Sequence, residues 1–464
     1  MSWVFVARLQ WIRKTAGMLL VTATFSVSIR AADLLEVYRL AQANDPTFEA
    51  ARFALEVVQQ RLPQARAGLL PVITATGNEG ATQANTSFGN NPAIDRNVRN
   101  SAWALQLTQP LLRMQNIYAY SESQARLEQA VAQFKQAEQD LILRVAQAYF
   151  DVAVAESNIA VAEAQVRAVG EQLAIATRGF GLGTTAITDT YEAKSRADLA
   201  RAQQIGSLNE LENKRSELEK ILGQAPMQLA VLRSSVVAPQ PQPADPQAWI
   251  TQARENNPAV RAQQAAFDAA EAAVHKIESE HLPFLDLTAS YGANTSTANL
   301  TTPADYATRG RSATIGVQLT IPLYAGGGTQ ARVMEAIASR YKTRAELEAA
   351  RRQAGNEARQ AYAGVANGLA QTEALDSAVQ SGRSAVKGNQ VGYKAGLRIN
   401  IDVLNAEQQL YTSQRDLAKA RYDTLFQGLK LKAAAGALSE ADVASINLLL
   451  TKQTEKNSAL TNTQ

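Results

Sequence analysis

The sequence predicts a mixed, mainly α-helical protein built of two similar halves, each with a long helical rod and a pair of β-strands. Apolar residues recur in a four-then-three rhythm over five heptads from Leu141 to Ala176, which is typical of helices that supercoil with a left hand. The same rhythm returns 213 residues later, from Ala361 to Asn389. Each half also contains two segments that alternate apolar and polar residues, as strands do.

Prolines indicate the duplication independently of the helical rhythm. Three of them recur at an offset of 212, so that Pro46, Pro71 and Pro110 return as Pro258, Pro283 and Pro322. We therefore expect a first repeat at 33–235 and a second at 248–443, joined by a Pro-rich linker at 236–247. A polar, disordered tail is expected at 444–464. A unit of over 200 residues is far longer than a solenoid repeat.

Residues 1–32 are expected to be a signal peptide, because basic residues precede an apolar run from Ala16 to Phe25. An uncleaved anchor helix is the alternative. Removal of this segment would take away four basic and no acidic residues and change the net charge from +3 to −1. Nucleic-acid binding therefore has no support. The chain has no Cys, which excludes disulfides, thiolate chemistry and a lipid-modified N-terminal cysteine.

The helices are expected in the same order in both halves. Residues 33–66 read as helical with a restart at Pro46, and a long helix is expected from about 116 to 178. Glycine-containing segments at 179–189 and 392–402 follow the long helices. We expect each to be the tip of a helical hairpin, with helices returning over about 186–222 and 400–435.

Between the first helices and the rods, each half is expected to hold two strands of about 10–14 residues, separated by polar loops at 79–100 and 295–311. Alternation assigns Leu287 and Val317 to an apolar face and Thr288 and Gln318 to a polar one. Two strands per half cannot close a barrel, and open sheet edges are not viable in lipid. A membrane barrel shared between protomers is the main interpretation, and a hairpin packed on a soluble core is the alternative.

No catalytic site, cofactor or metal is expected. His275 and His281 are the two histidines, and a spacing of six keeps them off one helix face. The glycine-rich stretches at 179–183 and 325–330 lack the complete dinucleotide and phosphate-loop motifs. No nucleophile, base and orienting acid can be assembled from the spacing.

This order of elements resembles the TolC family of outer-membrane factors over essentially the whole mature chain. The most specific motifs are DLLEVYRLAQANDP at 33–46 and YKAGLRINIDVLNAEQQLY at 393–411, and they are similar to the type I protein secretion branch. The missing cysteine argues against the lipoprotein branch of drug-efflux ducts. The resemblance implies a homotrimer in the outer membrane of a Gram-negative bacterium, with a 12-stranded barrel of four strands per protomer and a coiled-coil tunnel through the periplasm.

The resemblance also implies a gate at the tips. Tyr393 and Arg398 match residues that tie the second tip to the first, and Thr188 and Asp189 match their acceptors. The alternative for Asp189 is a carboxylate in a first helical turn, where it favours the helix dipole.

Two further positions match an acidic ring that lines the mouth. Asp402 matches the first acidic residue of that ring, with the same helix-dipole alternative, and Asn405 occupies the second acidic position. Half of the ring is therefore missing, so that weaker cation selectivity and weaker divalent block are expected.

By resemblance, the function is an export duct of a tripartite type I secretion system, without catalytic activity. A periplasmic adaptor and an inner-membrane pump of the ABC or RND type would dock on tip residues Gly181, Leu182, Gly183, Thr184, Lys394, Ala395, Gly396 and Leu397. Two alternatives remain open. One is the same duct in multidrug or metal efflux, and the other is a structural envelope coiled coil without a pore.

Overall fold

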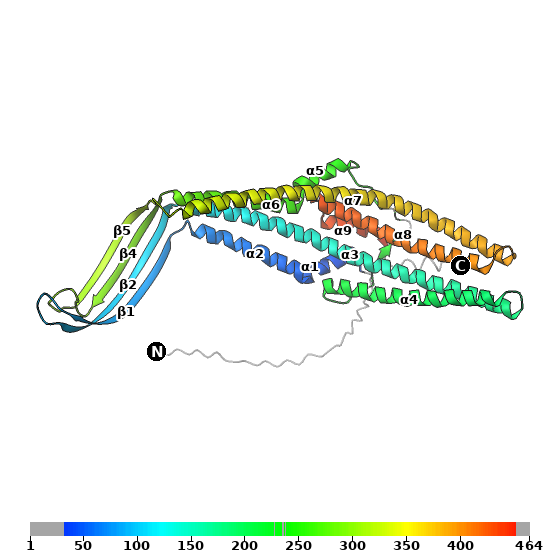
Figure 1. Cartoon of the computed structure of the whole chain (residues 1–464), viewed down its shortest axis with the longest axis horizontal. Coiled ribbons are helices and arrows are strands. Elements are labelled where there is room, and N and C mark those ends of the chain that lie inside the picture. The colour runs from blue at the N-terminus through cyan, green and yellow to red at the C-terminus, as the bar shows by residue number, and fades with distance from the viewer. Residues whose placement is uncertain (1–31, 227, 234–235, 237, 452–464) are drawn as a thin grey trace, which may run out of the picture.

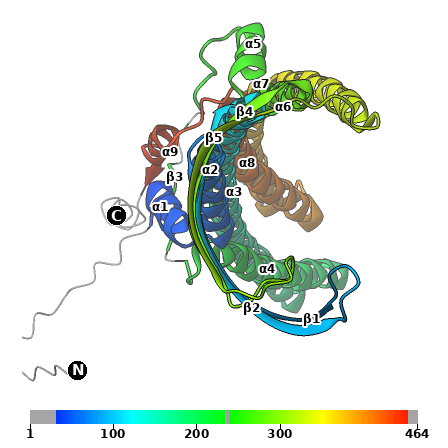
Figure 2. The same cartoon turned by 90° about the vertical axis from the view of Figure 1, so that its left-hand side faces the viewer.

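The computed structural model describes residues 32–226, 228–233, 236 and 238–451. The chain is elongated, with a curved sheet at one end and long antiparallel helices that run to two hairpin tips at the other end (Figure 1). Short elements gather near the middle of the rod, on the convex side of the molecule (Figure 2). No described helix is long and apolar enough to cross a membrane.

The first half begins with two short helices, α1 (Leu34–Asn44) and α2 (Pro46–Ala67). Asp45 separates them: its carboxylate accepts hydrogen bonds from the amides of Thr47 and Phe48, and Pro46 occupies the first helical position. The predicted restart at Pro46 is confirmed. Strands β1 (Val72–Thr86) and β2 (Ile94–Leu112) follow, and then the hairpin of α3 (Met114–Gly181) and α4 (Ile187–Leu222).

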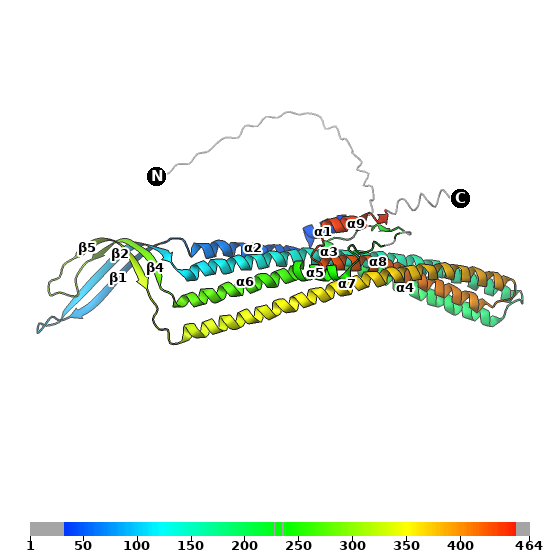
Figure 3. The same cartoon turned by 90° about the horizontal axis from the view of Figure 1, so that it is seen from above.

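The second half repeats this order. Its elements are α5 (Pro246–Asn256), α6 (Pro258–Glu278), the short 3₁₀ helix η1 (Ser279–His281), β4 (Phe284–Ser296), β5 (Thr308–Thr320), α7 (Gly328–Lys394) and α8 (Asn400–Ala434). The rods α2, α3, α6 and α7 run side by side from the sheet toward the middle of the molecule (Figure 3).

The ends of the fold differ from the predicted boundaries. Ala32, assigned to the signal peptide, is buried, and its backbone amide donates to the carbonyl of Gln228 at 2.8 Å. Within the predicted tail, α9 (Glu440–Asn447) continues to Asn447 and β6 (Leu450–Thr451) pairs with β3 (Val231–Leu232). Buried Ile446 holds this end against the core. Residues 1–31 and 452–464, where the rest of the signal and tail predictions fall, lie outside the described residues.

The predicted loops were too long. β1 continues to Thr86 and β2 begins at Ile94, so that residues 79–86 and 94–100 pair as strands instead of forming a loop. The second connection likewise runs only over 297–307. Both errors arise because Thr, Asn and Gln are common in loops. The backbone of such a polar stretch can nevertheless form strand hydrogen bonds where the neighbouring strand continues beside it.

The four strands form one antiparallel sheet in the order β1-β2-β4-β5, so that β2 and β4 join the two halves. Cross-strand partners share a face: Ile73 lies opposite Leu107, Leu107 opposite Ala289, and Ala289 opposite Ile315. The other face carries Thr74, Gln106, Ser290 and Thr314 in one row. The predicted alternation is confirmed, with Leu287 and Val317 on the apolar face and Thr288 and Gln318 on the polar one.

The largest core lies where α1, α3, α4, α8 and α9 meet. The predicted apolar rhythm of α3 supplies Leu141, Val145 and Val152, all fully buried. Tyr149 is also fully buried, and its hydroxyl donates to the carbonyl of Ala230 at 2.7 Å. Burial raises the pKa of this hydroxyl. The equivalent Tyr362 donates to the carbonyl of Ala244, so each rod anchors a connecting segment by the same kind of bond.

Candidate functional site

The two hairpin tips have the same backbone geometry at an offset of 213. Gly183 and Gly396 adopt φ of +71° and +74°, a region open to glycine, and each ends its long helix. The amide of Gly183 donates to the carbonyl of Phe180, as that of Gly396 does to Tyr393. The sequence therefore builds two copies of one sharp turn.

The predicted docking residues lie at the far end of the molecule (Figure 1) and are exposed. Leu182 on the first tip and Leu397 on the second are 80% and 81% exposed. Exposed leucines on tight turns of fixed geometry offer apolar contact area with little conformational freedom to lose.

Tyr393 on the second hairpin lies within electrostatic range of Asp189 on the first. Burial and the nearby Asp189 carboxylate raise the pKa of the Tyr393 hydroxyl. Within the described chain no hydrogen bond joins these two side chains, and Thr188 is exposed without a partner. One chain thus brings two of the predicted gate residues into electrostatic range.

Arg398 does not reach the first tip in this chain. Its guanidinium lies 3.7 Å from the carboxylate of Asp402, one helical turn along α8. Its aliphatic stem folds against Gly392, where an added Cβ would come within 2.8 Å of the Arg398 side chain. Arg398, predicted to tie the tips, therefore forms an ion pair with Asp402, which is predicted to lie in the acidic ring. The two charges neutralise each other within one chain.

Asn405, which the resemblance places in the ring, connects the two hairpins within one chain. Its side-chain oxygen accepts from Arg196 of α4 at 3.2 Å, and Arg196 also bonds Glu192 at 3.1 Å. Next to this bond, Leu404 packs into an apolar cluster with α3 and α4 residues, among them Val169 and Ala193. Sequence reasoning missed Arg196, for which the one available signal was its spacing of four from Glu192.

A buried polar layer lies farther along the same hairpin interface. Glu407 is 3% exposed, and one of its oxygens accepts from Gln390 of α7 at 3.3 Å. Its other oxygen has no hydrogen-bond partner. Burial raises the pKa of Glu407, the nearby side-chain amides of Gln390 and Gln172 oppose the rise, and Glu171 adds to it. Nearby, Gln165 of α3 donates to Gln408 of α8 at 2.8 Å.

A buried arginine lies at the far end of the sheet. Arg96 is buried on the polar face of β2, and its guanidinium donates to the carbonyls of Thr302 at 2.8 Å and Pro303 at 2.7 Å. It also stacks over the ring of Phe88. Arg96 thus holds the 297–307 connection over the end of the sheet.

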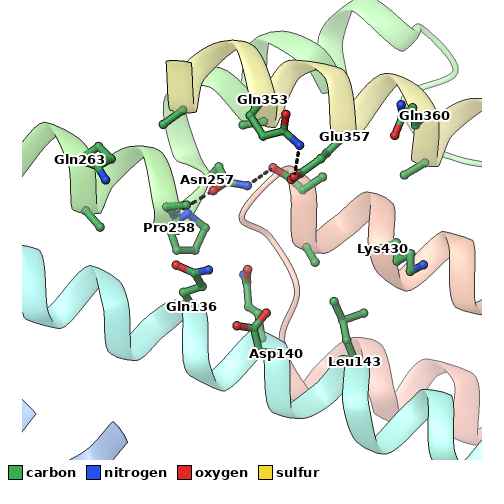
Figure 4. A pocket seen from close by; sticks show the side chains of 18 of the residues that line it. Gln136, Asp140, Leu143, Asn257, Pro258, Gln263, Gln353, Glu357, Gln360 and Lys430 are labelled. Atoms are coloured by element: carbon green, nitrogen blue, oxygen red, sulfur yellow. Dashed lines mark hydrogen bonds between the residues drawn. The ribbon is translucent and has the colours of Figure 1, made fainter. Parts of the chain in front are cut away.

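A hollow of about 750 Å³ lies between α3, α6, α7 and α8 (Figure 4). Glutamines line much of it, with Asp140, Glu357 and Lys430. Asn257 is committed to holding helix ends, since its amide donates to the carbonyl of Ala434 at 2.9 Å. Burial raises the pKa of Asp140, and Arg144 opposes the rise. The described residues contain no cluster that could hold a metal ion.

The family model described as "Outer membrane efflux protein" matches residues 37–224 and 249–437. The chain is 32% identical over 449 residues to the alkaline protease secretion protein AprF of Pseudomonas aeruginosa, covering 96% of this chain and 90% of that protein. It is 30% identical to the outer membrane protein TolC of Vibrio cholerae, covering 91% and 95%. The comparisons indicate no catalytic family.

Among solved structures, the outer membrane protein VceC of Vibrio cholerae matches with a TM-score of 0.74 at 19% identity. The alignment covers 87% of this chain and 96% of that one. The mainly helical, duplicated fold class predicted from the sequence is confirmed.

Proposed function

The chain belongs to the outer membrane efflux protein family, and we propose that three copies of it form the export duct of a type I protein secretion system. It is an outer-membrane channel protein that extends into the periplasm. The proposal rests on one observation above all: the sheet of a single chain is curved but open, with β1 and β5 as unpaired edges. Open edges are not viable in lipid, so they must pair between copies.

The duplication supplies a template for that pairing. β4 is the repeat of β1 and β5 is the repeat of β2, both at an offset of 212. The β2–β4 register, in which Trp103 lies opposite Ala293, is therefore a guide for β5 against β1 of the next copy. Shifting it by 212 places Ile315 opposite Ala81 and Thr314 opposite Thr82.

Glycines support this register. At Gly292 a Cβ would lie 2.5 Å from the carbonyl oxygen of Trp103, so the β2–β4 contact requires glycine there. Its repeat is Gly80, around which nothing lies within 4 Å in the single chain. In the proposed seam Gly80 meets Gly316, which explains a glycine that no contact within the chain requires.

The height of the apolar band gives a second check. A row of paired residues that starts at Gly77 of one copy crosses its four strands and reaches Asn85 in β1 of the next copy. The register therefore advances by eight residues per protomer, which requires the strands to tilt relative to the barrel axis. At constant height the apolar face then carries Gly77, Leu105, Ala289 and Val317 on one level. The next level carries Trp103, Tyr291 and Ile315, with Glu79 as its charged member. A level band is what a membrane requires.

Engineered cysteines test the seam cleanly, because the chain contains none. Ala81→Cys with Ile315→Cys, and separately Thr82→Cys with Thr314→Cys, should give covalent trimers after oxidation of isolated outer membranes. Along an antiparallel strand pair, directly opposite residues alternate between a larger and a smaller Cα–Cα distance. One of the two cysteine pairs therefore has the smaller distance.

The matched control combines Ala81→Cys with Ala313→Cys, which is a diagonal pair beyond disulfide reach. Covalent trimers from this control alone would mean that the barrel is shared but the register is wrong. No covalent product from any pair, with a stable monomer in detergent, would reject the shared barrel.

Protein secretion is favoured over efflux because the chain resembles a protease secretion protein over 96% of its length. The test is complementation: the chain, expressed with its own pump and adaptor genes, should carry their cargo protein into the medium. Drug or metal efflux remains the second candidate, favoured by the family's description. It predicts instead lowered accumulation of ethidium or metal with no protein exported.

Tripartite assembly is proposed to occur at the tips, where the adaptor contacts Leu182 and Leu397 and the pump engages beneath. Tyr393, Arg398, Thr188 and Asp189 are proposed to close the mouth between copies, with Asp402 in the ring. Support comes from the approach of Tyr393 to Asp189 and from the exposure of both leucines. Planar-bilayer recording separates this duct from a structural coiled coil, which would show no conductance.

A further inference from the structure

Three arginines lie together on the apolar face of the sheet, above the band that faces lipid. Arg99 is on β2, and Arg309 and Arg311 are on β5, at odd-numbered positions that share this face with Trp103 and Ile315. They lie near the first residues of β2 and β5. These strand ends point away from the helices (Figure 1), toward the extracellular end of an outer-membrane channel.

All three side chains are exposed, and no hydrogen bond or ion pair within the described chain engages their guanidinium groups. Arg96, three residues before Arg99 in the same strand, gives the contrast. It points to the polar face, is buried and is surrounded by loop carbonyls. Arg96 and Arg99 lie on the same strand, so the difference between them follows from the face that each occupies: Arg99 is unpaired because it lies on the apolar face.

The three arginines lie on the two strands that flank β4. The amide of Arg99 donates to the hydroxyl of Thr297 at 2.9 Å, and Arg309 lies opposite Thr295 in the register. Two strand spacings separate β2 from β5, roughly 10 Å, so guanidinium groups on long side chains can meet over β4. Below them, Trp103 and Tyr291 pack edge to face with ring centroids 5.6 Å apart.

Guanidinium groups above an aromatic level suit one ligand chemistry. Arginine binds phosphate bidentately, and aromatic rings lie at the membrane–water interface. We propose that Arg99, Arg309 and Arg311 bind the phosphate groups of a phosphorylated glycolipid in the outer leaflet. This inference rests on the proposed barrel, because the apolar face must face lipid.

The test compares purified trimers of wild type, of Arg99→Gln/Arg309→Gln/Arg311→Gln, and of a control that carries Arg344→Gln/Arg359→Gln/Arg383→Gln. The control loses the same charge from exposed positions on α7. Binding of purified lipopolysaccharide, of the same lipid after dephosphorylation, and of phosphatidylglycerol is measured by native mass spectrometry and by lipid titration in detergent.

We expect wild type and the α7 control to bind lipopolysaccharide equally, and the β-sheet variant to bind it at least about tenfold more weakly. Dephosphorylation should reduce binding to wild type by a similar factor. Equal binding by all three proteins, or unchanged binding after dephosphorylation, would overturn the phosphate site. Equally tight binding of phosphatidylglycerol would overturn the assignment to a glycolipid.

One further outcome would assign the arginines to a different role. In the proposed seam Arg311 lies opposite Asn85 of the next copy, and Asn85 is bonded to Asp95 at 2.7 Å. If the β-sheet variant dissociates into monomers, the arginines are seam partners and the lipid site is rejected. Conductance of the intact variant trimer reports on the duct separately, so that failure of the lipid site leaves the proposed function standing.

Discussion

Replacing Glu407 with Gln should stabilise the packing between the two hairpins at neutral pH. The ionised carboxylate is almost fully buried, with one hydrogen bond from Gln390 at 3.3 Å and one oxygen without a partner. An unsatisfied buried polar group costs about 1–3 kcal/mol. Gln has nearly the same shape, carries no charge and can still accept from Gln390. Its new amide can donate to the side-chain oxygen of nearby Gln172, which has no partner, so this penalty should largely disappear.

The same reasoning predicts a pH dependence for wild type. The pKa of Glu407 is raised by burial above the ordinary value of 4.5, so the packed state binds the proton more tightly than the open state does. The contribution of Glu407 to the stability of the packed state is therefore fully present below pH 4.5 and is lost as the pH rises through the raised pKa. In Glu407→Gln this dependence should be absent.

Hydrogen–deuterium exchange over 390–410, corrected for intrinsic rates, measures the effect directly. At pH 8 protection should be about 5- to 150-fold greater in Glu407→Gln than in wild type, the factor that corresponds to about 1–3 kcal/mol. The control is Glu373→Gln, an exposed position on α7, which should match wild type. The reasoning is refuted if Glu407→Gln keeps the wild-type pH dependence or exchanges faster at pH 8.

Three further predictions concern the barrel and the mouth. Leu287→Arg should reduce the yield of SDS-resistant trimer, because a charge on the lipid face costs roughly 2–4 kcal/mol at mid-depth, whereas Thr288→Arg on the polar face should not; equal yields would reverse the face assignment. Tyr393→Phe with Arg398→Ser should increase planar-bilayer conductance, since it removes donors worth about 1 kcal/mol each, or up to roughly 3 where charged; unchanged conductance would place the ties elsewhere. Gly292→Val should abolish assembly, because its Cβ would overlap the neighbouring β2 backbone at 2.5 Å, and normal trimer yield would disprove the close approach.

Local patterns were sufficient for most of the fold. The rhythm from Leu141 to Ala176 predicted the buried face of α3, and the glycines at 183 and 396 predicted both tips, because each depends on residues within one or two helical turns. The offset of 212 predicted the repeated order of elements. Strand ends were harder, because polar residues at 79–86 pair only through a neighbouring strand that the sequence does not identify.

The gate region shows where local patterns fail. The resemblance implied the ring position of Asn405, and that position stays a prediction, whereas its bond to Arg196, 209 residues away along the chain, had no signal in the sequence. Nothing in the sequence singles out Glu407, and its burial follows from α8 packing against α3 and α7. No short-range pattern records either contact.

The sequence by itself determined the secondary structure, the duplication and the alternating faces of the strands, because these follow from backbone propensity and the helical and strand periods of side chains. Tertiary structure alone decided which polar residues are buried and which partners they meet. Ala32 joins the fold beside Leu229, and Arg398 pairs with Asp402 instead of the first tip, because such contacts depend on the relative placement of distant elements. The contribution of a polar side chain to folding stability depends on that placement. An exposed polar side chain contributes little, whereas one that is buried without a partner is destabilising.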